Sequence, residues 1–389
     1  MQKLIRITTV PLSLKTLLKG QHRFMRENGF EVIGVSSKGK ELEDVKNDEG
    51  IPVIELEMTR TISPFKDIVS LWKFYRLCKI EKPKIVHSHT PKAGIIGMLG
   101  ARFAGVPIRL HTVAGMPLME ASGLKRHVLN FVEKLTYSAA TKVYPNSKGL
   151  YDFIIENKFT STSKLKVIGN GSSNGINTSF FNVDEISNQN SAALKTQLKI
   201  EKNDFVYVFV GRIVSDKGMN ELVKAFSKIC KLPNERSSKL LLVGSFETEL
   251  DPLSKETLRE IEENDSIIHV GFQQDVRPFL TISDCLVFPS YREGFPNVVM
   301  QAGSMGLPSI VTNINGCNEI IIEGENGTII PVKNEQMLQI AMVKLKNNSE
   351  YFKKIQLNAR NFITSRYEQK ILWEALFEEY NKLIEKDFR

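Results

Sequence analysis

The sequence predicts an α/β protein of two domains, each built on a parallel sheet, and three observations lead to this fold class. The chain has 389 residues, which is more than one hydrophobic core usually spans. Short apolar runs alternate with helical patterns along both halves, as in parallel sheets covered by helices. Apolar residues make up 42% and charged residues 25% of the chain, so a folded globular protein is expected and a disordered one is excluded.

The first half contains the strands and helices of one such domain. Apolar runs predict strands over 3–9, 30–35, 51–55, 85–89, 108–110 and 142–144, and helical spacing predicts helices over 14–29, 64–80, 93–104, 124–140 and up to residue 157. The helix over 14–29 would carry a basic face of Lys15, Lys19, His22 and Arg26. Such a face is either a solvated helix surface or a contact with a membrane surface or lipid diphosphate, and both interpretations stay open.

The second half repeats this alternation after a polar segment. Residues 183–203 have the composition of an interdomain connection, and the second domain is expected to begin near Asp204. Strands are predicted over 205–210, 240–243, 267–270 and 285–288, and helices over 335–346, 351–363 and 368–386.

Three of the six histidines fall at predicted strand ends, where parallel sheets bind their ligands. His87 and His89 would point the same way from one strand, but no third ligand accompanies them, so no metal site is predicted. One of the two is expected in the core. His111 precedes a glycine-containing turn, and a substrate contact and a core position are equally supported for it.

The region after the predicted strand 285–288 has the features of a phosphate site. Gly294 and Pro296 break the loop, and Asn297 is predicted to cap a helix over 298–305. The amides and positive dipole end of such a helix bind phosphate, and Glu293 would lie beside them. Arg212 and Lys217 follow the strand 205–210 around a glycine-bounded turn, where they could hold an anionic leaving group or could belong to a solvated loop.

Charge is distributed unevenly along the chain. Residues 1–180 carry 27 Lys and Arg against 15 Asp and Glu, a net charge of +12, and the remainder carries 25 against 29, a net charge of −4. A basic first domain suits an anionic membrane surface or a diphosphate-bearing substrate, and no nucleic-acid-binding motif accompanies it.

Several other classes of protein lack support. The four cysteines are scattered without a Cys-x-x-Cys pair, which indicates reduced thiols and not a zinc site or disulfide framework. Neither a Gly-x-Gly-x-x-Gly fingerprint nor a P-loop is present, so an oxidoreductase or P-loop ATPase is not expected. The lack of an apolar run of spanning length or a signal peptide predicts a cytoplasmic protein.

Taken together, these motifs resemble the retaining family 4 glycosyltransferases of the GT-B fold, in which two Rossmann-like domains face each other across a cleft. The resemblance covers nearly the whole chain and is strongest in the second half, where the matching residues are Gly211-Arg212 with Lys217-Gly218, Pro289-Ser290 with Glu293-Gly294-Phe295-Pro296, Gly306 with Pro308, and Gly316 with Glu319. Weaker matches in the first half are His111-Thr112, Ser147 and Asn170-Gly171.

The resemblance implies a domain organisation and a set of site residues. Residues 1–185 would form the acceptor domain, 186–203 the linker, 204–365 the nucleotide-sugar domain, and 366–389 a helix returning to the first domain. The implied catalytic residues are Glu293, His111, Arg212 and Lys217. Donor contacts would come from Arg212, Lys217, Gly271, Phe272, Val276, Glu293, Gly294, Phe295, Pro296, Asn297, Val298 and Gln301. The acceptor side would include Lys15, Lys19, His89, Lys92 and His111.

In the mechanism that the resemblance implies, cationic groups stabilise the departing diphosphate without a metal or other cofactor, and a donor phosphate oxygen assists deprotonation of the acceptor on the same face. Two departures from the family pattern are present. Gln301 stands where the family usually has a glutamate for the ribose hydroxyls, and Val10-Pro11-Leu12-Ser13 replaces the usual glycine-rich turn after the first strand. Because a neutral amide binds a hydroxyl more weakly than a carboxylate does, roughly tenfold weaker donor binding is expected.

The resemblance thus implies transfer from a nucleotide sugar, most simply a UDP-linked hexose or N-acetylhexosamine, to a polyprenyl-diphosphate-linked saccharide of a surface polysaccharide. The enzyme would act peripherally on the inner face of the plasma membrane, without nucleic acid, and its oligomeric state stays open. Two alternatives also stay open: an enzyme like UDP-N-acetylglucosamine 2-epimerase, and a noncatalytic binding subunit of glycan assembly.

Overall fold

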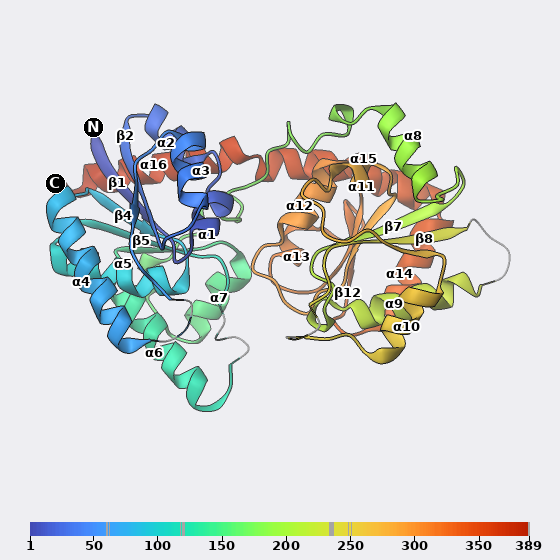
Figure 1. Cartoon of the computed structure of the whole chain (residues 1–389), viewed down its shortest axis with the longest axis horizontal. Coiled ribbons are helices and arrows are strands. Elements are labelled where there is room, and N and C mark those ends of the chain that lie inside the picture. Colours follow the sequence, from blue (N-terminus) through green and yellow to red (C-terminus); the bar gives the residue numbers. More distant parts are fainter. Residues whose placement is uncertain are drawn as a thin grey trace. The chain divides into compact units, whose positions relative to one another are not determined.

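The computed structural model describes residues 1–59, 61, 63–116, 118, 121–232, 237–247, 249 and 251–387. The chain divides into two compact units, which are described separately. Unit 1 comprises residues 1–175 together with the C-terminal helix α16 (Gln369–Asp387), and unit 2 comprises residues 176–368. Each unit contains one six-stranded parallel sheet with helices packed against it, which confirms the predicted α/β class (Figure 1).

The sheet of unit 1 has the strand order β3-β2-β1-β4-β5-β6. Its strands are β1 (Gln2–Ile7), β2 (Phe30–Ser36), β3 (Val53–Glu55), β4 (Ile85–Ser88), β5 (Ile108–Val113) and β6 (Lys142–Pro145). All neighbouring pairs are parallel, with Leu4 opposite Val32 on one side and Ile85 on the other. Successive strands are added on one side of β1 up to β3 and on the other side from β4 onward, so the strand order reverses between β1 and β4. Ligands of such sheets bind beyond the carboxyl ends of the strands at this reversal.

Helices cover unit 1 in two layers, each with its own apolar cluster. The first layer contains α1 (Pro11–Leu17), α2 (Gln21–Glu27), α3 (Glu41–Glu49) and α16, and its cluster joins Leu14, Leu18 and Val45 to Leu372, Leu376 and Tyr380 of α16. The second contains α4 (Pro64–Glu81), α5 (Pro91–Ala104) and α6 (Gly123–Ala139), with α7 (Lys148–Glu156) and the short η2 (Thr162–Lys164) completing the unit. Ser147 caps α7, since its Oγ accepts the Leu150 amide hydrogen.

The predicted single helix over 14–29 is wrong, because two helices occupy this segment. Gly20 separates α1 from α2 with a left-handed φ of 81°. A side chain at Gly20 would collide with the Trp373 ring of α16, since an added Cβ would lie 2.5 Å from Trp373 Cη2. The break turns His22 into the interior, where it is fully buried. His22 therefore does not belong to the expected basic face.

The sheet of unit 2 has the order β12-β11-β10-β7-β8-β9. Its strands are β7 (Phe205–Val210), β8 (Ser238–Val243), β9 (Ile267–His269), β10 (Cys285–Phe288), β11 (Ser309–Thr312) and β12 (Gly327–Ile330). The winding reverses between the paired central strands β7 and β10. This places the loops that follow β7 and β10 next to each other at the carboxyl edge of the sheet.

The helices of unit 2 surround one continuous apolar core. They are α8 (Asn188–Gln197), α9 (Met219–Cys230), α10 (Lys255–Glu263), α11 (Arg277–Thr281), α12 (Asn297–Ser304), α13 (Cys317–Ile320), α14 (Glu335–Asn347) and α15 (Ser349–Tyr367), with the 3₁₀ turns η3 (Val183–Glu185) and η4 (Ser215–Lys217). No helix in the described ranges has both the length and the apolar character needed to span a membrane.

The boundaries of the two units differ from the predicted linker over 186–203. That segment contains α8, which Ser187 caps by accepting the Asn190 amide hydrogen. Ile186, Leu194 and Leu198 pack against the core of unit 2. The polar composition of the segment therefore reflects the exposed face of a helix that belongs to unit 2, and the division between the units falls after Gly175 and after Glu368.

Candidate active site

The loops after β7 and β10 pack directly against each other at the reversal point of unit 2. Gly218 ends η4 with φ 71°, and an added Cβ there would lie 2.2 Å from the carbonyl oxygen of Pro289. The Tyr291 amide donates to the Asp216 carbonyl at 2.9 Å, which joins the two loops a second time. Only a glycine allows the backbones to approach this closely, so Gly218 holds the β7 loop against the β10 loop.

This packing brings Lys217 to Glu293. Lys217 Nζ forms an ion pair and hydrogen bond with Glu293 Oε1, although the two residues are 76 positions apart in the sequence. Their side chains are 15% and 17% exposed. Ser290 Oγ donates to the same carboxylate oxygen at 3.1 Å. The carboxylate of Glu293 is thus oriented by two donors from two loops.

The backbone around Glu293 is also fixed from the loop that follows β11. Asn315 Nδ2 donates to the carbonyl oxygens of Glu293 at 3.2 Å and of Gly294 at 2.6 Å. Gly316, with φ 75°, lies so close that an added Cβ would be 2.6 Å from the Gly294 oxygen. Three consecutive strand ends of the sheet, those of β7, β10 and β11, therefore position one carboxylate.

The helix α12 begins directly after this loop, but the predicted N-cap is wrong. Pro296 is the capping residue, with φ −75° and ψ 112°, and Asn297 is the exposed first residue of the helix. The ring of Pro296 restricts φ to the value found there, and helices commonly start just after such an extended residue. No side chain caps this end. The first-turn amides of α12 can therefore bind an anion such as a phosphate.

Phe295 contributes to this site through its backbone only. Its side chain is buried, and its ring centroid lies 5.4 Å from that of Tyr367 at the end of α15. The aromatic contact anchors the loop between β10 and α12 on the core of unit 2. Val298, next along α12, is half-buried against the same core.

Arg212 forms its ion pair with Glu247 and not with Glu293. Its Nη1 is 2.7 Å from Glu247 Oε2, and its side chain is 51% exposed. A long guanidinium at the surface can exchange an exposed carboxylate for a ligand oxygen, since exposed ion pairs are weak. The structure therefore places both predicted cations at the end of β7, one in a partly buried pair and the other in an exposed one.

The other predicted donor residues lie after β9 and on α12. Gly271 has φ 71°, and its carbonyl accepts the Gly244 amide hydrogen at 2.9 Å. Phe272 follows with 75% of its surface exposed. Val276 is half-buried at the start of α11, and Gln301 is half-buried in the second turn of α12. An exposed aromatic ring beside a left-handed glycine can stack on a planar base.

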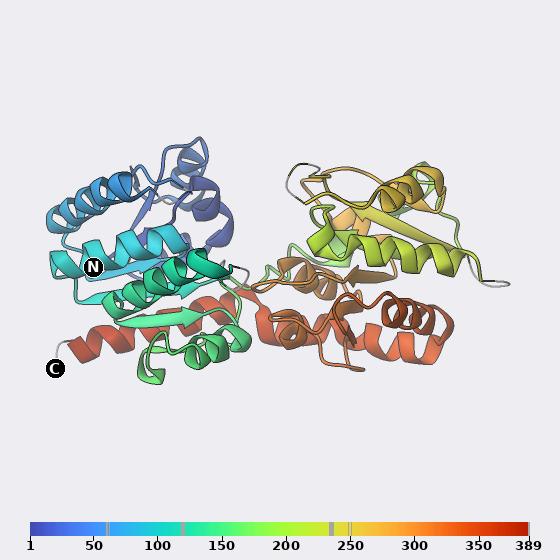
Figure 2. The ribbon, with the colours of Figure 1, turned by 90° about the horizontal axis from the view of Figure 1, so that it is seen from below.

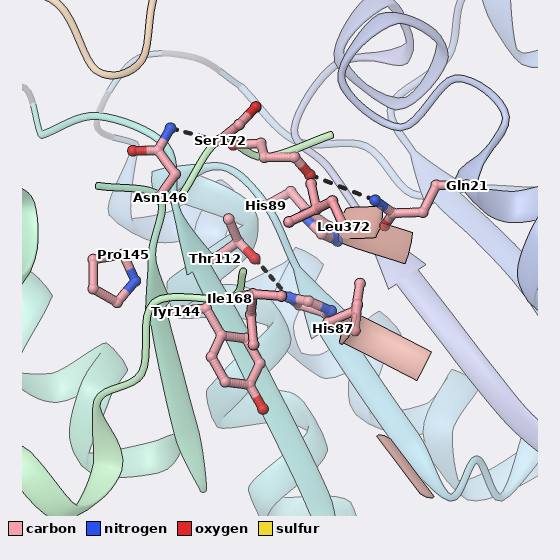
Figure 3. Close-up of a pocket in the computed structure, with 12 residues that line it drawn as sticks. Gln21, His87, His89, Thr112, Tyr144, Pro145, Asn146, Ile168, Ser172 and Leu372 are labelled. Atoms are coloured by element: carbon pink, nitrogen blue, oxygen red, sulfur yellow. Dashed lines mark hydrogen bonds between the residues drawn. The ribbon is translucent and has the colours of Figure 1, made fainter. Parts of the chain in front are cut away.

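A second group of polar residues lies at the carboxyl edge of the sheet in unit 1. Figure 3 shows a small pocket there, with a volume of about 20 Å³, enough for one water molecule. It is lined by Gln21, His87, His89, Thr112, Tyr144, Pro145, Asn146, Ile168, Ser172, Ser173, Leu372 and Leu376. Several of these polar residues, among them Gln21, Asn146 and Ser172, were not predicted, because they come from separate segments that share no motif.

His87 is a buried structural residue, as predicted for one of the two histidines. Its Nδ1 lies 2.5 Å from the Tyr380 hydroxyl of α16, and its Nε2 lies 2.7 Å from Thr112 Oγ1. The His89 ring packs against the His87 ring with 4.1 Å between centroids and the two planes tilted by 30°. Both nitrogens of His89 are buried without a hydrogen-bond partner among the described residues. Burial and the neighbouring His87 hold the pKa of His89 well below its ordinary value, so the ring is neutral.

His111 is also buried, between β5 and α5. Its Nδ1 lies 2.8 Å from Ser88 Oγ, and its Cε1 is so close to Gly94 that an added Cβ there would lie 2.6 Å away. Burial lowers the pKa of His111 to about 4. At neutral pH this imidazole is uncharged, so it can exchange hydrogen bonds with a substrate but cannot supply positive charge.

The predicted acceptor-side lysines do not form one cluster. Lys15 pairs with Asp44 of α3 at 2.7 Å, and Lys92 pairs with Asp67 of α4 at 2.5 Å. Lys19 is exposed just beyond the end of α1. Two of the three charges are therefore balanced by carboxylates of neighbouring helices.

Thr9, directly before the Val10–Ser13 segment that replaces a glycine-rich turn, joins the end of β1 to the residues after β4. The Thr9 amide donates to Thr90 Oγ1 at 2.9 Å, and the two hydroxyl oxygens lie 2.7 Å apart. Pro11 then opens α1 at a position where its missing amide hydrogen is not needed.

Comparison with known proteins assigns both halves of the chain to glycosyltransferases. A family model described as "Glycosyl transferases group 1" matches residues 190–362, and one described as "Glycosyl transferase 4-like domain" matches residues 21–171. The capsular polysaccharide biosynthesis glycosyltransferase CapM of Staphylococcus aureus is 34% identical over 385 residues, with 99% of this chain and 98% of CapM covered.

Two further similarities extend over nearly the whole chain. The UDP-Gal:alpha-D-GlcNAc-diphosphoundecaprenol alpha-1,3-galactosyltransferase of Escherichia coli is 27% identical, with 93% of each chain covered. The crystal structure of Anabaena Alr3699/HepE in complex with UDP superposes with a TM-score of 0.80 at 17% identity, covering 98% of this chain and 100% of that one. The fold, the two family models and the similarity to CapM lead to one conclusion: the chain belongs to the family 4, group 1 glycosyltransferases of the GT-B fold.

Proposed function

We propose that this glycosyltransferase moves a sugar from a UDP-linked donor to a polyprenyl-diphosphate-linked saccharide, with retention of anomeric configuration, during assembly of a capsule or related surface polysaccharide. The observation that carries the proposal is the Lys217–Glu293 pair beside the start of α12. The similarity to CapM supports the polysaccharide context, and the substrate named for the Escherichia coli relative supports both the UDP donor and the lipid-linked acceptor.

The donor would lie across the carboxyl edge of the unit 2 sheet. Lys217 has three N–H donors, so it can keep its bond to Glu293 and still bind a diphosphate oxygen. Arg212 would leave Glu247 for the diphosphate, and the first-turn amides of α12 would bind the remaining oxygens. Gly271, Phe272 and Val276 would receive the base, and Gln301 would bind the ribose hydroxyls.

Glu293 would act on the sugar. Its carboxylate, held by Lys217 and Ser290, would bind sugar hydroxyls and stabilise positive charge at the anomeric carbon as the diphosphate departs. A diphosphate stabilised by cations and amides leaves without protonation by a protein acid. A donor phosphate oxygen would take the acceptor proton on the same face, which retains configuration. We propose that no metal takes part, because Arg212, Lys217 and the first-turn amides of α12 would together neutralise the charge of the leaving group.

Unit 1 would bind the acceptor at the inner face of the plasma membrane. Its net positive charge over residues 1–180 suits a diphosphate-linked saccharide. Lys15, Lys19 and Lys92 would contribute charge, and the neutral rings of His89 and His111 would contribute hydrogen bonds. For Lys15 and Lys92 this requires exchange of the ion pairs with Asp44 and Asp67.

The test is a transfer assay with a panel of UDP-, GDP- and dTDP-sugars and a short-chain prenyl-diphosphate-linked N-acetylglucosamine as acceptor. The expected result is transfer from a UDP-sugar, unchanged by EDTA, with a product whose anomeric proton coupling matches that of the donor. An inverted product would overturn the retaining mechanism. Recovery of a donor epimerised at C2 would establish the epimerase alternative, and binding of UDP-sugars without turnover would establish a noncatalytic subunit.

A further inference from the structure

The outer face of α4 in unit 1 carries large apolar side chains that the structure leaves in contact with solvent. Phe65 is 88% exposed and Trp72 is 54% exposed, although both belong to a helix whose opposite face is buried through Phe74 and Cys78. The remaining exposed apolar residues of the helix are Ile68, Val69 and Ile80. Large contiguous apolar surfaces of this kind mark interaction sites in folded proteins.

These side chains form one stripe. Phe65, Val69 and Trp72 are separated by four and three residues, so they lie above one another on the same side of the helix. Arg76 continues the stripe four residues later, and its guanidinium carbon lies 4.8 Å from the centre of the Trp72 ring. Lys66, Lys73 and Lys79 are exposed along the margins.

The exposed face of α4 lacks acidic residues over its full described length of 18 residues. The helix has only two acids, and each is paired on the inner side. Asp67 is bound by Lys92 of α5, and Glu81 is bound by Lys3 of β1 at 2.7 Å. The ion pairs remove the negative charges from the outer face and leave it apolar at the centre and cationic around it.

Helix α6, which packs on α5 as α4 does, has the same character. Leu124, Val128 and Phe131 are exposed at spacings of four and three, and Lys125 and Lys134 are exposed beside them. The one acid of α6, Glu133, is buried. Figure 2 shows α4, α5 and α6 side by side in one layer of unit 1, so both stripes belong to one helical layer.

A groove of about 250 Å³ lies beside the amino-terminal half of α4. It is lined by Phe65, Lys66, Val69, Ser70 and Lys73 from the helix and by Glu57 and Thr59 from the preceding segment. Two lysines against one glutamate leave this groove with a positive balance. Its size and charge suit the phosphate group of a lipid head, with an apolar wall on one side.

We propose that the outer face of α4, from Phe65 to Lys79, docks the protein on an anionic lipid bilayer. An apolar stripe of Phe and Trp flanked by Lys and Arg, with no exposed acid on the helix itself and Glu57 alone at the edge of the groove, matches the boundary between acyl chains and anionic headgroups. Long Lys side chains can keep their charges at headgroup level while the ring residues enter the apolar zone. The inference rests on the proposed function in one respect, since a lipid-linked acceptor is the reason for a bilayer to be the partner.

This surface differs from the basic helix that the sequence alone indicates. Lys15 is paired with Asp44, and the Arg26 guanidinium donates to the Gly50 carbonyl at 2.7 Å. Both cations therefore bind α3 or the Gly50 residue that ends it. The exposed cations of α4 lie beside exposed aromatic side chains. In the segment over residues 11–27 the aromatic side chain, Phe24, packs instead on Trp373 and Phe377 of α16.

The experiment uses the full-length protein, without donor or acceptor, and vesicles of phosphatidylcholine with or without 30% phosphatidylglycerol, the anionic component. The chain has two tryptophans, and Trp373 is half-buried in unit 1, where it packs against Gly20 and donates a 2.7 Å hydrogen bond to Asn174. Brominated lipid in the vesicles should therefore quench Trp72 alone. The expected result is quenching with the anionic vesicles, and its loss in W72F, which should still bind.

Binding itself is measured by co-sedimentation. The double variant F65S/W72S and the triple variant K66E/K73E/K79E should each bind the anionic vesicles at least about tenfold more weakly. The matched controls are L357S, which removes an 80% exposed leucine from α15 of unit 2, and K15E/K19E. Both controls should bind like the unchanged protein.

Unquenched tryptophan emission with anionic vesicles would overturn the proposal and would point to a protein partner on this face. Equal loss of binding in K15E/K19E and in the α4 variants would also overturn it. The proposed function is tested independently of this docking surface. F65S/W72S should retain its rate of sugar transfer to a water-soluble short-chain acceptor, a reaction that needs no bilayer.

Discussion

Lys217 and Glu293 form a partly buried ion pair that joins the loops after the two central strands of unit 2. The pair lies where the winding of the sheet reverses, and Ser290 and Asn315 fix the same carboxylate and its backbone. A charged side chain held by several partners loses little freedom when a ligand binds. The pair therefore sets the position of Glu293 before the donor arrives.

The stability of unit 2 should reveal the coupling between these two residues. K217A and E293Q should each lower the free energy of unfolding by about 1–2 kcal/mol, because each leaves a partly buried partner without its bond. The double variant should be less destabilised than the sum of the single effects. Calorimetric unfolding of the four proteins in the cycle gives the coupling energy directly. Strict additivity of the two single effects would mean that the pair does not interact in solution.

Gln301 should limit the affinity for the donor nucleotide. Q301E should bind UDP about tenfold more tightly, because a hydroxyl bond to a charged acceptor is stronger than one to a neutral amide. Isothermal calorimetry with UDP is the measurement. The control is Q356E, which adds the same charge on an exposed position of α15 in the same unit. Unchanged or weaker UDP affinity in Q301E would remove Gln301 from the ribose site.

Tyr380 should link α16 to the sheet of unit 1. Its hydroxyl is bonded to His87 Nδ1 at 2.5 Å and receives a bond from Arg6 Nη2 at 3.1 Å, and all three residues are buried. Y380F should lower the free energy of unfolding by about 1–3 kcal/mol, because two buried polar groups lose a partner.

Urea unfolding followed by tryptophan fluorescence reports this loss, since both tryptophans belong to unit 1. The control Y151F removes a hydroxyl from α7, where the ring lies 4.3 Å from Lys148 Nζ at the surface. A Y380F protein as stable as Y151F would show that the Tyr380 hydrogen bonds contribute nothing to stability.

Acid should destabilise unit 1 through its buried histidines. Burial and the Arg6 guanidinium lower the pKa of His22 to about 3, and burial lowers the pKa of His111 to about 4, from the ordinary value of 6.5. Between pH 6.5 and about 4 the unfolded chain binds these protons and the folded chain does not. The free energy of unfolding is therefore greatest above pH 6.5. It decreases as the pH is lowered, by about 1.4 kcal/mol per pH unit for each such histidine.

Replacement of one of these histidines should reduce that slope. Between pH 6 and 4, the free energy of unfolding should fall less steeply with acidification in H22L than in the unchanged protein, by about 1.4 kcal/mol per pH unit. Urea unfolding at several pH values measures both slopes. H127Q, at an exposed position of α6, should keep the original slope. An identical slope in H22L would show that His22 is not held neutral in the folded state.

Much of the fold could be predicted because buried parallel strands are short apolar runs between polar breaks. Phe205 to Val210 and Cys285 to Phe288 are such runs, and the structure has strands with the same bounds. The break at Gly20 was missed, since the flanking residues continue a helical pattern and the cause lies in Trp373, far along the chain. Burial of His22 follows from that break.

The site could be predicted only as separate parts. Arg212, Lys217 and Glu293 were each placed at a strand end by local pattern. The Lys217–Glu293 bond depends on β10 pairing with β7, which no local pattern contains. The N-cap was misplaced by one residue because Pro296 and Asn297 are both common at helix starts. The pocket around His89 draws on several segments and carries no sequence motif.

The most direct measurement is the rate of sugar transfer by K217A and E293Q with the UDP-sugar that the panel identifies. Each variant should lose at least about 100-fold in kcat while circular dichroism shows an unchanged fold, since both side chains would stabilise charge that develops in the transition state. The control K228A removes a lysine that pairs with Glu335 at 2.6 Å elsewhere in unit 2, and its rate should stay within about twofold. Turnover of K217A and E293Q equal to that of K228A would contradict the assignment of the active site.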